Sequence, residues 1–303
     1  MNQTPIIIDT DPGIDDAAAI SMALNHPNID VKMIATVNGN VNIDKTTANA
    51  LKLKAFLNSD VPVYRGAEAP LNCALFDAAE VHGESGMDGY DFDPVDETQL
   101  ASGHAIPAMR DVIMQSHTPI TLVPIGPLTN IALLLKTYPE VKHNIKEIIL
   151  MGGSTGRGNA TPAAEFNIYC DPEAADIVFK SQLPITMVGL DVADSAMLTF
   201  DGLDRLRTLN RTGEMLHDLF RHYRGDDFDK GIKIYDAYTI LYLLHPEDFN
   251  TVRAHVAIEC DGRYTKGMTV VDMLSEAPNA NVLLSMDESK FETRFFDTIT
   301  YCQ

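Results

Sequence analysis

The sequence predicts an α/β protein with an open, mostly parallel, Rossmann-like sheet, helices on both faces of that sheet, and a C-terminal α+β extension. Two observations support this prediction. Short apolar runs alternate with helical patterns through the first two thirds of the chain, and the pattern changes in the last third. With 303 residues, 45% of them hydrophobic, the chain is long enough to bury a large core. We therefore expect a single domain over residues 1–303.

Each element is predicted from its local pattern. Strands are expected at residues 6–8, 31–37, 61–64, 120–125, 148–151 and 185–188, where apolar and β-branched residues cluster. Helices are expected at residues 17–24, 45–57, 106–115, 131–138 and 172–181, the last with Asp171 as its N-cap and Pro172 at its first position. In the last third we expect helices near residues 204–223 and 236–245, strands at 255–259, 269–271 and 282–285, and a closing helix from Glu288.

Residues 9–16, with the sequence DTDPGIDD, place four carboxylates directly after the first predicted strand. Like charges this close raise one another's pKa unless a cation or several amide donors offset them. Asp15 or Asp16 alone could be an ordinary helix cap, which the helix dipole favours. The four acids together indicate a bound cation.

Polar residues also follow the later strands of the predicted sheet. Asn38 and Asn40 follow the second strand, a turn begins at Gly126, a glycine-rich stretch covers residues 152–159, and Asp191 comes after the strand at 185–188. In an open parallel sheet, ligands bind beyond the carboxyl ends of the strands. We therefore expect these loops to build one site at that edge.

Five segments, in this order, resemble the nucleoside hydrolase family, whose members split the N-glycosidic bond of ribonucleosides with the help of calcium. They are DTDPGIDD at 9–16, TVNGN at 36–40, HGESGM at 82–87, GPLTN at 126–130, and the stretch from MGG at 151–153 to Asn167. The resemblance covers nearly the whole chain. It implies an inosine-uridine preferring or broad-specificity hydrolase that releases ribose and free base, in the salvage of purine or pyrimidine bases.

The same resemblance implies a calcium site. Asp11, Asp16 and Asp236 would ligate Ca²⁺ through their carboxylates, and the main-chain carbonyl of Ile125 would be a further ligand. Ca²⁺ prefers ~6 to 8 oxygen ligands, which carboxylates, a carbonyl, water and sugar hydroxyls can supply. The ion would hold the attacking water and the ribose hydroxyls, and Asp11 would accept the proton of that water.

A substrate-binding set is implied in the same way. Carboxylates and amides can bond to ribose hydroxyls, and acids favour a cationic transition state. Taken singly, Asn159 and Asn167 are as typical of turns, and Met151 and Phe166 are more typical of a core. The family match places Asp15, Asn40, Asn159, Glu165 and Asn167 around the ribose, with Met151 and Phe166 packed on the sugar.

His82 lies in a polar, glycine-containing segment that runs to Asp93, a composition typical of a flexible loop able to cover a site. A lone histidine in a loop is usually only solvated. Within HGESGM, however, the family match places His82 near the nucleobase. A second segment, residues 224–231, is also a candidate to close over the substrate.

The chain departs from the family pattern at Tyr235. Many relatives carry His immediately before the last metal-binding Asp, where it can help to protonate the departing base. A tyrosine hydroxyl, with a reference pKa near ~10, is a weaker proton donor than imidazolium at neutral pH. We therefore expect departure of the base to depend on His82, Tyr223, Tyr235 or ordered water.

Composition limits the partners. The chain has 23 basic and 43 acidic residues and a net charge of −20, so nucleic acids and anionic membranes are poor partners. Because no apolar stretch could span a bilayer and no signal region precedes the first strand, we expect a cytoplasmic protein. The four cysteines lie far apart and indicate neither a zinc site nor a disulfide framework. The family resemblance implies a homodimer or homotetramer.

Other interpretations account for less of the sequence. Aspartyl-phosphate phosphatases have Gly-Thr or Gly-Ser after their second Asp, where this chain has Pro12, and the offsets of an EF-hand are not met. The glycine-rich stretch 152–158 lacks the Gly-Lys-Ser/Thr of a phosphate loop and lies among acids that would repel phosphate. One alternative stays open: a ribonucleoside-binding protein that keeps the calcium and ribose site but hydrolyses poorly because of Tyr235.

Overall fold

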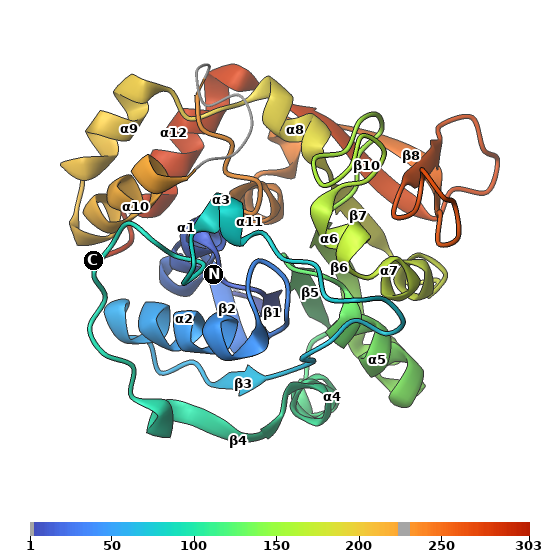
Figure 1. Ribbon diagram of the computed structural model, residues 1–303, viewed down its shortest axis with the longest axis horizontal. Helices are drawn as coiled ribbons and strands as arrows, with labels where there is room; N and C mark the ends of the chain where they lie inside the picture. Colours follow the sequence, from blue (N-terminus) through green and yellow to red (C-terminus); the bar gives the residue numbers. More distant parts are fainter. Residues whose placement is uncertain (1–2, 224–230) are drawn as a thin grey trace.

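The computed structural model describes residues 3–223 and 231–303, whose strands form one ten-stranded sheet (Figure 1). These strands are β1 (Thr4–Thr10), β2 (Ile29–Thr36), β3 (Val63–Arg65), β4 (Leu100–His104), β5 (Ile120–Pro124), β6 (Ile145–Met151), β7 (Ile185–Val188), β8 (Phe249–Ile258), β9 (Thr269–Asp272) and β10 (Ala280–Met286). Their spatial order is β4-β3-β2-β1-β5-β6-β7-β10-β8-β9. All neighbours from β4 to β10 in this order pair in parallel, whereas β8 pairs antiparallel with both β10 and β9.

Helices cover both faces of this sheet. They are α1 (Ile14–Asn25), α2 (Ile43–Phe56), α3 (Ala79–His82), α4 (Ala105–Gln115), α5 (Thr129–Thr137), α6 (Phe166–Cys170), α7 (Pro172–Phe179), α8 (Leu190–Ser195), α9 (Phe200–Arg207), α10 (Arg211–His222), α11 (Ala237–Leu244) and α12 (Glu288–Ile299). Figure 1 shows α9, α10 and α12 together on one side of the molecule and α4, α5 and α7 on the other. The class predicted from sequence, helices on both faces of a mostly parallel sheet, is confirmed.

Two apolar cores lie on the two faces, and β1 contributes to both. Ile6 and Ile8 pack into the core beneath α1, α10, α11 and α12, whereas Ile7 packs into the core beneath α4, α5 and α7. Successive side chains of a strand point to opposite faces, so an uninterrupted apolar run is what a strand covered on both sides requires. Complete burial of these isoleucines also fixes the register of β1, since a shift by one residue would carry Asp9 into a core.

The C-terminal third is continuous with the main sheet. Strand β10 pairs in parallel with β7, and β8 and β9 extend the same sheet, so the expected α+β extension is not a separate layer. Asp171 caps α7 by accepting a hydrogen bond from the Ala174 amide at 3.1 Å, with Pro172 at the first helical position, as predicted. The sequence did not predict β4, which contains Gly103 and is largely exposed, or the short helices α3, α6 and α8.

Strand direction decides where a site can form. Strands β1, β2, β5 and β6 are parallel neighbours, so the segments that follow Thr10, Thr36, Pro124 and Met151 emerge at the same edge.

Within the described residues, no helix is both long and apolar enough to cross a membrane.

Candidate active site

A cavity of about 600 Å³ lies at the edge where these strands end. It is deep enough to enclose a small polar molecule. Asp11 and Asp16 do not line it, and both are buried, with 1% and 0% of their surface exposed. The other predicted site residues all line the cavity: Asp15, Asn40, His82, Ile125, Met151, Asn159, Glu165, Phe166, Asn167, Tyr223, Tyr235 and Asp236.

Asp11 has one satisfied and one unsatisfied carboxylate oxygen. Its Oδ2 accepts a hydrogen bond from the Asn40 backbone amide at 2.7 Å. Its Oδ1 is buried and has no hydrogen-bond partner among the described residues. A buried oxygen without a partner is costly, so a ligand that contacts it is favoured at this position.

Asp16 is held by donors from its own loop and from the loop after β2. Its Oδ1 accepts from the Thr10 hydroxyl at 2.5 Å, and its Oδ2 accepts from the Gly13 amide at 2.9 Å and from Asn40 Nδ2 at 3.2 Å. The bond from Gly13 makes Asp16 a capping residue of α1 as well. Asp16 can therefore cap α1 and belong to the site at the same time.

Asp15, Asp16 and Asp236 form a compact buried group, with one oxygen of each lying within 4.8 Å of the others. Two of them begin α1, and the third comes directly before α11, so distant parts of the chain meet here. The family resemblance implies Asp11 as a metal ligand and Asp15 as a ribose ligand, whereas this geometry groups Asp15 with two of the expected metal ligands, Asp16 and Asp236. Asp11 lies close enough for its charge to raise the pKa of Asp236.

Burial and mutual repulsion disfavour the charged forms of these acids. Burial, with the charge of Asp16 as the second cause, raises the pKa of Asp15 to about 8. Burial and the neighbouring acids hold the pKa of Asp11 and of Asp236 well above the usual range. A cation among these carboxylates would favour their ionised forms, which burial and mutual repulsion disfavour.

Glu165 and Asn167 are fixed by the backbone around them. Glu165 caps α6: its Oε1 accepts from the Asn167 amide at 2.9 Å, and its Oε2 accepts from the Gly153 amide at 2.9 Å. Burial nevertheless raises the pKa of Glu165 to about 7. The Asn167 side chain donates to the Ile125 carbonyl at 2.9 Å and to the Met151 carbonyl at 3.2 Å. Asn167 thus joins the ends of β5 and β6, at the carbonyl expected to be a metal ligand.

Asn159 and Phe166 lie at the outer part of the cavity. Asn159 is exposed, and its Oδ1 accepts a hydrogen bond from the Phe166 amide at 2.9 Å, which is the turn-forming use considered for it. Phe166 contacts Phe76, with ring centroids 5.8 Å apart, and Phe76 also contacts Tyr169 at 5.1 Å. Sequence reasoning missed Phe76, because it lies in an irregular segment without a motif or a period.

His82, expected near the nucleobase in a flexible loop, lines the cavity but lies in a short helix rather than in a loop. It ends the short helix α3 and is 6% exposed. Its Nδ1 accepts a hydrogen bond from the Ile14 amide at 3.1 Å, and its ring lies 5.4 Å from that of Tyr223. Burial lowers the pKa of His82 to about 4, so the imidazole is neutral at physiological pH. The other segment proposed to cover the site, residues 224–231, lies outside the described residues except for Gly231.

The two tyrosines complete this side of the cavity. Tyr223 and Tyr235 are 7% and 8% exposed, and both line the cavity, with Tyr235 directly before Asp236. Burial, followed by the charge of Asp15, raises the pKa of Tyr223 well above its usual range. Its hydroxyl therefore keeps its proton and can serve as a hydrogen-bond donor.

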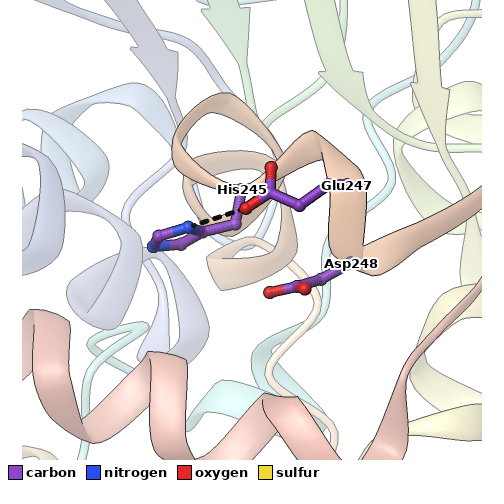
Figure 2. Close-up of side chains that lie close together, drawn as sticks. All are labelled: His245, Glu247 and Asp248. Atoms are coloured by element: carbon purple, nitrogen blue, oxygen red, sulfur yellow. Dashed lines mark ion pairs between the residues drawn. The ribbon is translucent and has the colours of Figure 1, made fainter.

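A second group of possible metal ligands lies at the end of α11, where His245, Glu247 and Asp248 come together (Figure 2). Here a side-chain cation is already present. Arg294 Nε donates to Asp248 at 2.7 Å, and its NH2 lies 3.7 Å from Glu247. His245 pairs with Glu247 at 3.4 Å. Because the guanidinium neutralises these acids, we assign the group a structural role.

The chain matches the family described as inosine-uridine preferring nucleoside hydrolase over residues 6–293. It belongs to this family. Among curated relatives, the non-specific ribonucleoside hydrolase RihC of Salmonella newport is 53% identical over 98% of this chain and 97% of that protein. The Salmonella heidelberg protein of the same name is 55% identical over 94% of each chain.

Solved structures agree with this assignment. A purine-preferring ribonucleoside hydrolase from Gardnerella vaginalis superposes with a TM-score of 0.91, at 30% identity over 98% of both chains. An inosine-guanosine nucleoside hydrolase gives a TM-score of 0.92, at 29% identity over 99% of both chains. This nucleoside hydrolase is therefore an enzyme that hydrolyses N-glycosidic bonds, and its recognition from sequence is confirmed.

Proposed function

We propose that this enzyme hydrolyses purine and pyrimidine ribonucleosides to ribose and free base, with Ca²⁺ held by Asp11, Asp16, Asp236 and the Ile125 carbonyl. The observation that carries the proposal is the group of buried acids at the inner end of a cavity, where burial and mutual repulsion favour a bound cation. A broad base preference is supported by RihC, which is named non-specific, at 53% identity.

The residues present fit a hard divalent ion. The oxygens available are carboxylates and a main-chain carbonyl, which are the ligands that Ca²⁺ prefers. The buried Oδ1 of Asp11, which has no hydrogen-bond partner among the described residues, is available to such an ion. When bound, the ion would supply positive charge that lowers the pKa of a coordinated water and orients the ribose hydroxyls.

Asp11 is the proposed general base. The Asn40 amide holds Oδ2, so that Oδ1 has a fixed position and a lone pair free to accept the proton of the attacking water. Asn40 Nδ2 donates to the Asp11 carbonyl at 3.2 Å and to Asp16. Asn40 therefore holds both acids in place, and its Oδ1 is the atom we assign to a ribose hydroxyl.

Asp15, Glu165, Asn159 and Asn167 are the proposed partners of the ribose, with Met151 and Phe166 packed against it. The negative potential of the acids stabilises an oxocarbenium-like sugar as the C1′–N bond breaks. No Lys or Arg occurs among the described residues that line the cavity. The lining therefore favours an uncharged nucleoside over a nucleotide, whose phosphate the acids would repel.

Departure of the base is assigned to His82, Tyr223 and Tyr235. Burial and the bond from Ile14 keep His82 neutral, so it contributes a hydrogen bond rather than an imidazolium proton. The Tyr235 hydroxyl replaces the histidine that many relatives carry at this position, which we propose alters base preference. We further propose a cytoplasmic homodimer or homotetramer that acts in base salvage, supported by the family resemblance.

A substrate panel tests this function. Ribose release is measured from uridine, inosine, cytidine and adenosine, with metal-replete enzyme, with a chelator, and with Ca²⁺ restored. We expect ribose from all four nucleosides, loss of activity with the chelator, and recovery with Ca²⁺. If no nucleoside releases ribose although nucleosides still bind, the chain is instead a ribonucleoside-binding protein.

A further inference from the structure

The buried amide of Asn49, on α2, connects two segments of the site. Asn49 is 1% exposed. Its Nδ2 donates to the Pro12 carbonyl at 3.0 Å and to the Ser85 carbonyl at 2.8 Å, which uses both hydrogens of the amide. Its Oδ1 accepts from Lys52 Nζ at 3.3 Å. A side chain with both donors committed to two different loops fixes the position of one loop relative to the other.

The two loops that Asn49 joins are those of the acids and of His82. Pro12 lies within the acidic segment 9–16, and Ser85 follows His82 in the segment 82–87. The same two segments meet again where the Ile14 amide donates to His82 Nδ1 at 3.1 Å. A movement of the segment 82–87 relative to the segment 9–16 would therefore disturb both contacts, including the one that orients the imidazole.

Close packing opposes movement of these two segments toward their neighbours. Gly86 has a φ of +84°, and a Cβ at this position would lie 2.9 Å from Val41 and 3.1 Å from Asn49 Nδ2. A Cβ on Gly13 would lie 2.7 Å from His82 Nδ1. The backbone of each segment therefore approaches its neighbours more closely than a side chain would allow, and Asn49 lies between them.

The bond from Ile14 determines the tautomer of His82. Because Nδ1 accepts a hydrogen, the neutral ring carries its proton on Nε2. His82 lines the cavity, so Nε2–H is the polar group that this ring can offer to a bound base. If the bond from Ile14 were lost, the proton could move to Nδ1, and Nε2 would become an acceptor.

We propose that Asn49 is a positioning residue for His82, which holds the segment 82–87 so that the imidazole presents Nε2–H to the departing base. This inference rests on the proposed function. As the C1′–N bond breaks, its electron pair moves to the base nitrogen, and the hydrogen bond from Nε2 stabilises the negative charge that develops on the base. Water supplies the hydroxyl to C1′ and its proton to Asp11, solvent protonates the released base, and His82 keeps its own proton.

The test compares substrates that differ in their need for leaving-group assistance. Uridine has a poor leaving group, whereas p-nitrophenyl β-D-riboside releases a phenolate that departs unaided. Asn49→Asp is isosteric, but its carboxylate cannot donate to the Pro12 and Ser85 carbonyls. Asn49→Ala removes the same two hydrogen bonds without adding a charge. We expect both variants to lower kcat for uridine by about 10- to 100-fold and kcat for the p-nitrophenyl riboside by less than about threefold.

Two controls make the result specific. Lys52→Gln, on the same helix, removes only the contact to Asn49 Oδ1 and should behave as wild type. In a His82→Ala background, Asn49→Ala should have no further effect on uridine, because the residue it positions is already absent. Equal losses on both substrates, no loss on uridine, or additive losses in the double variant would overturn the proposal. If wild type cleaves the p-nitrophenyl riboside but no nucleoside, the proposed function fails as well.

Discussion

The inner end and the mouth of the cavity are built in different ways. Next to the inner end, Asp11 and Asp16, which do not line the cavity, are almost completely buried, and backbone amides of their own and neighbouring loops hold their oxygens. At the mouth, Leu75 and Phe76 are 59% and 41% exposed and lie in an irregular segment. The contrast fits our proposal that side chains at the strand ends act in bond cleavage, whereas side chains of irregular segments contact the base.

The largest effect should come from the inner end. Asp11→Asn removes the proposed general base while keeping the shape of the side chain, so we expect kcat for uridine to fall by about 10³-fold or more. The same change removes a buried acid whose ionisation opposes folding, so the chelated variant should melt at a higher temperature than chelated wild type. Asp111→Asn, at an exposed position, serves as the control. A variant with near-normal kcat would show that another group activates the water.

The second effect concerns stability and pH. Burial raises the pKa of Asp15 from 3.8 to about 8 and that of Glu165 from 4.5 to about 7. Between pH of about 4 and 8, the folded chain therefore holds protons that the unfolded chain has released, and the free energy of unfolding falls as pH rises. In chelator we expect a loss on the order of a few kcal/mol from pH of about 5 to 8, measured by urea unfolding.

A bound cation should reduce that loss, because it replaces the protons as the partner of the acids. The same unfolding series with Ca²⁺ present is the control. If the chelated protein instead gains stability as pH rises over this range, the acids are already ionised in the folded state, and the argument for a cation is lost.

A smaller effect should come from Tyr235, the buried residue directly before Asp236. Tyr235→His restores the residue that many relatives carry and supplies a stronger proton donor, so we expect the ratio of kcat/KM for inosine and uridine to change by about tenfold. Tyr242→His, outside the cavity lining, is a matched control. An unchanged ratio with unchanged rates would show that Tyr235 does not influence base preference.

The smallest effect is expected at Asn159. Its Oδ1 accepts from the Phe166 amide, and its side chain is exposed, so Asn159→Ala should raise KM less than about fivefold and leave kcat nearly unchanged. Steady-state kinetics with uridine measure both. A loss in kcat as large as that expected for Asp11→Asn would place Asn159 with the inner acids rather than with the outer turn.

The same contrast explains what could be predicted from the sequence. The acids at 9–16 and the polar residues after β2, β5 and β6 could be placed at one edge, because parallel strands must end together. The burial of His82 and its hydrogen bond from Ile14 could not be predicted, since α3 has only four residues and no apolar periodicity. Phe76 and Asn49 were also missed, because neither their contacts nor their burial leave a local signal.

The central claim is that a cation held by the inner acids makes the site active. The most direct measurement titrates Ca²⁺ into metal-free enzyme and records bound ion and uridine hydrolysis in the same samples. We predict that activity rises in proportion to bound Ca²⁺ until one ion is bound per chain, and that Asp236→Asn abolishes both. Full activity in the metal-free enzyme, or binding without any gain in activity, would contradict the account.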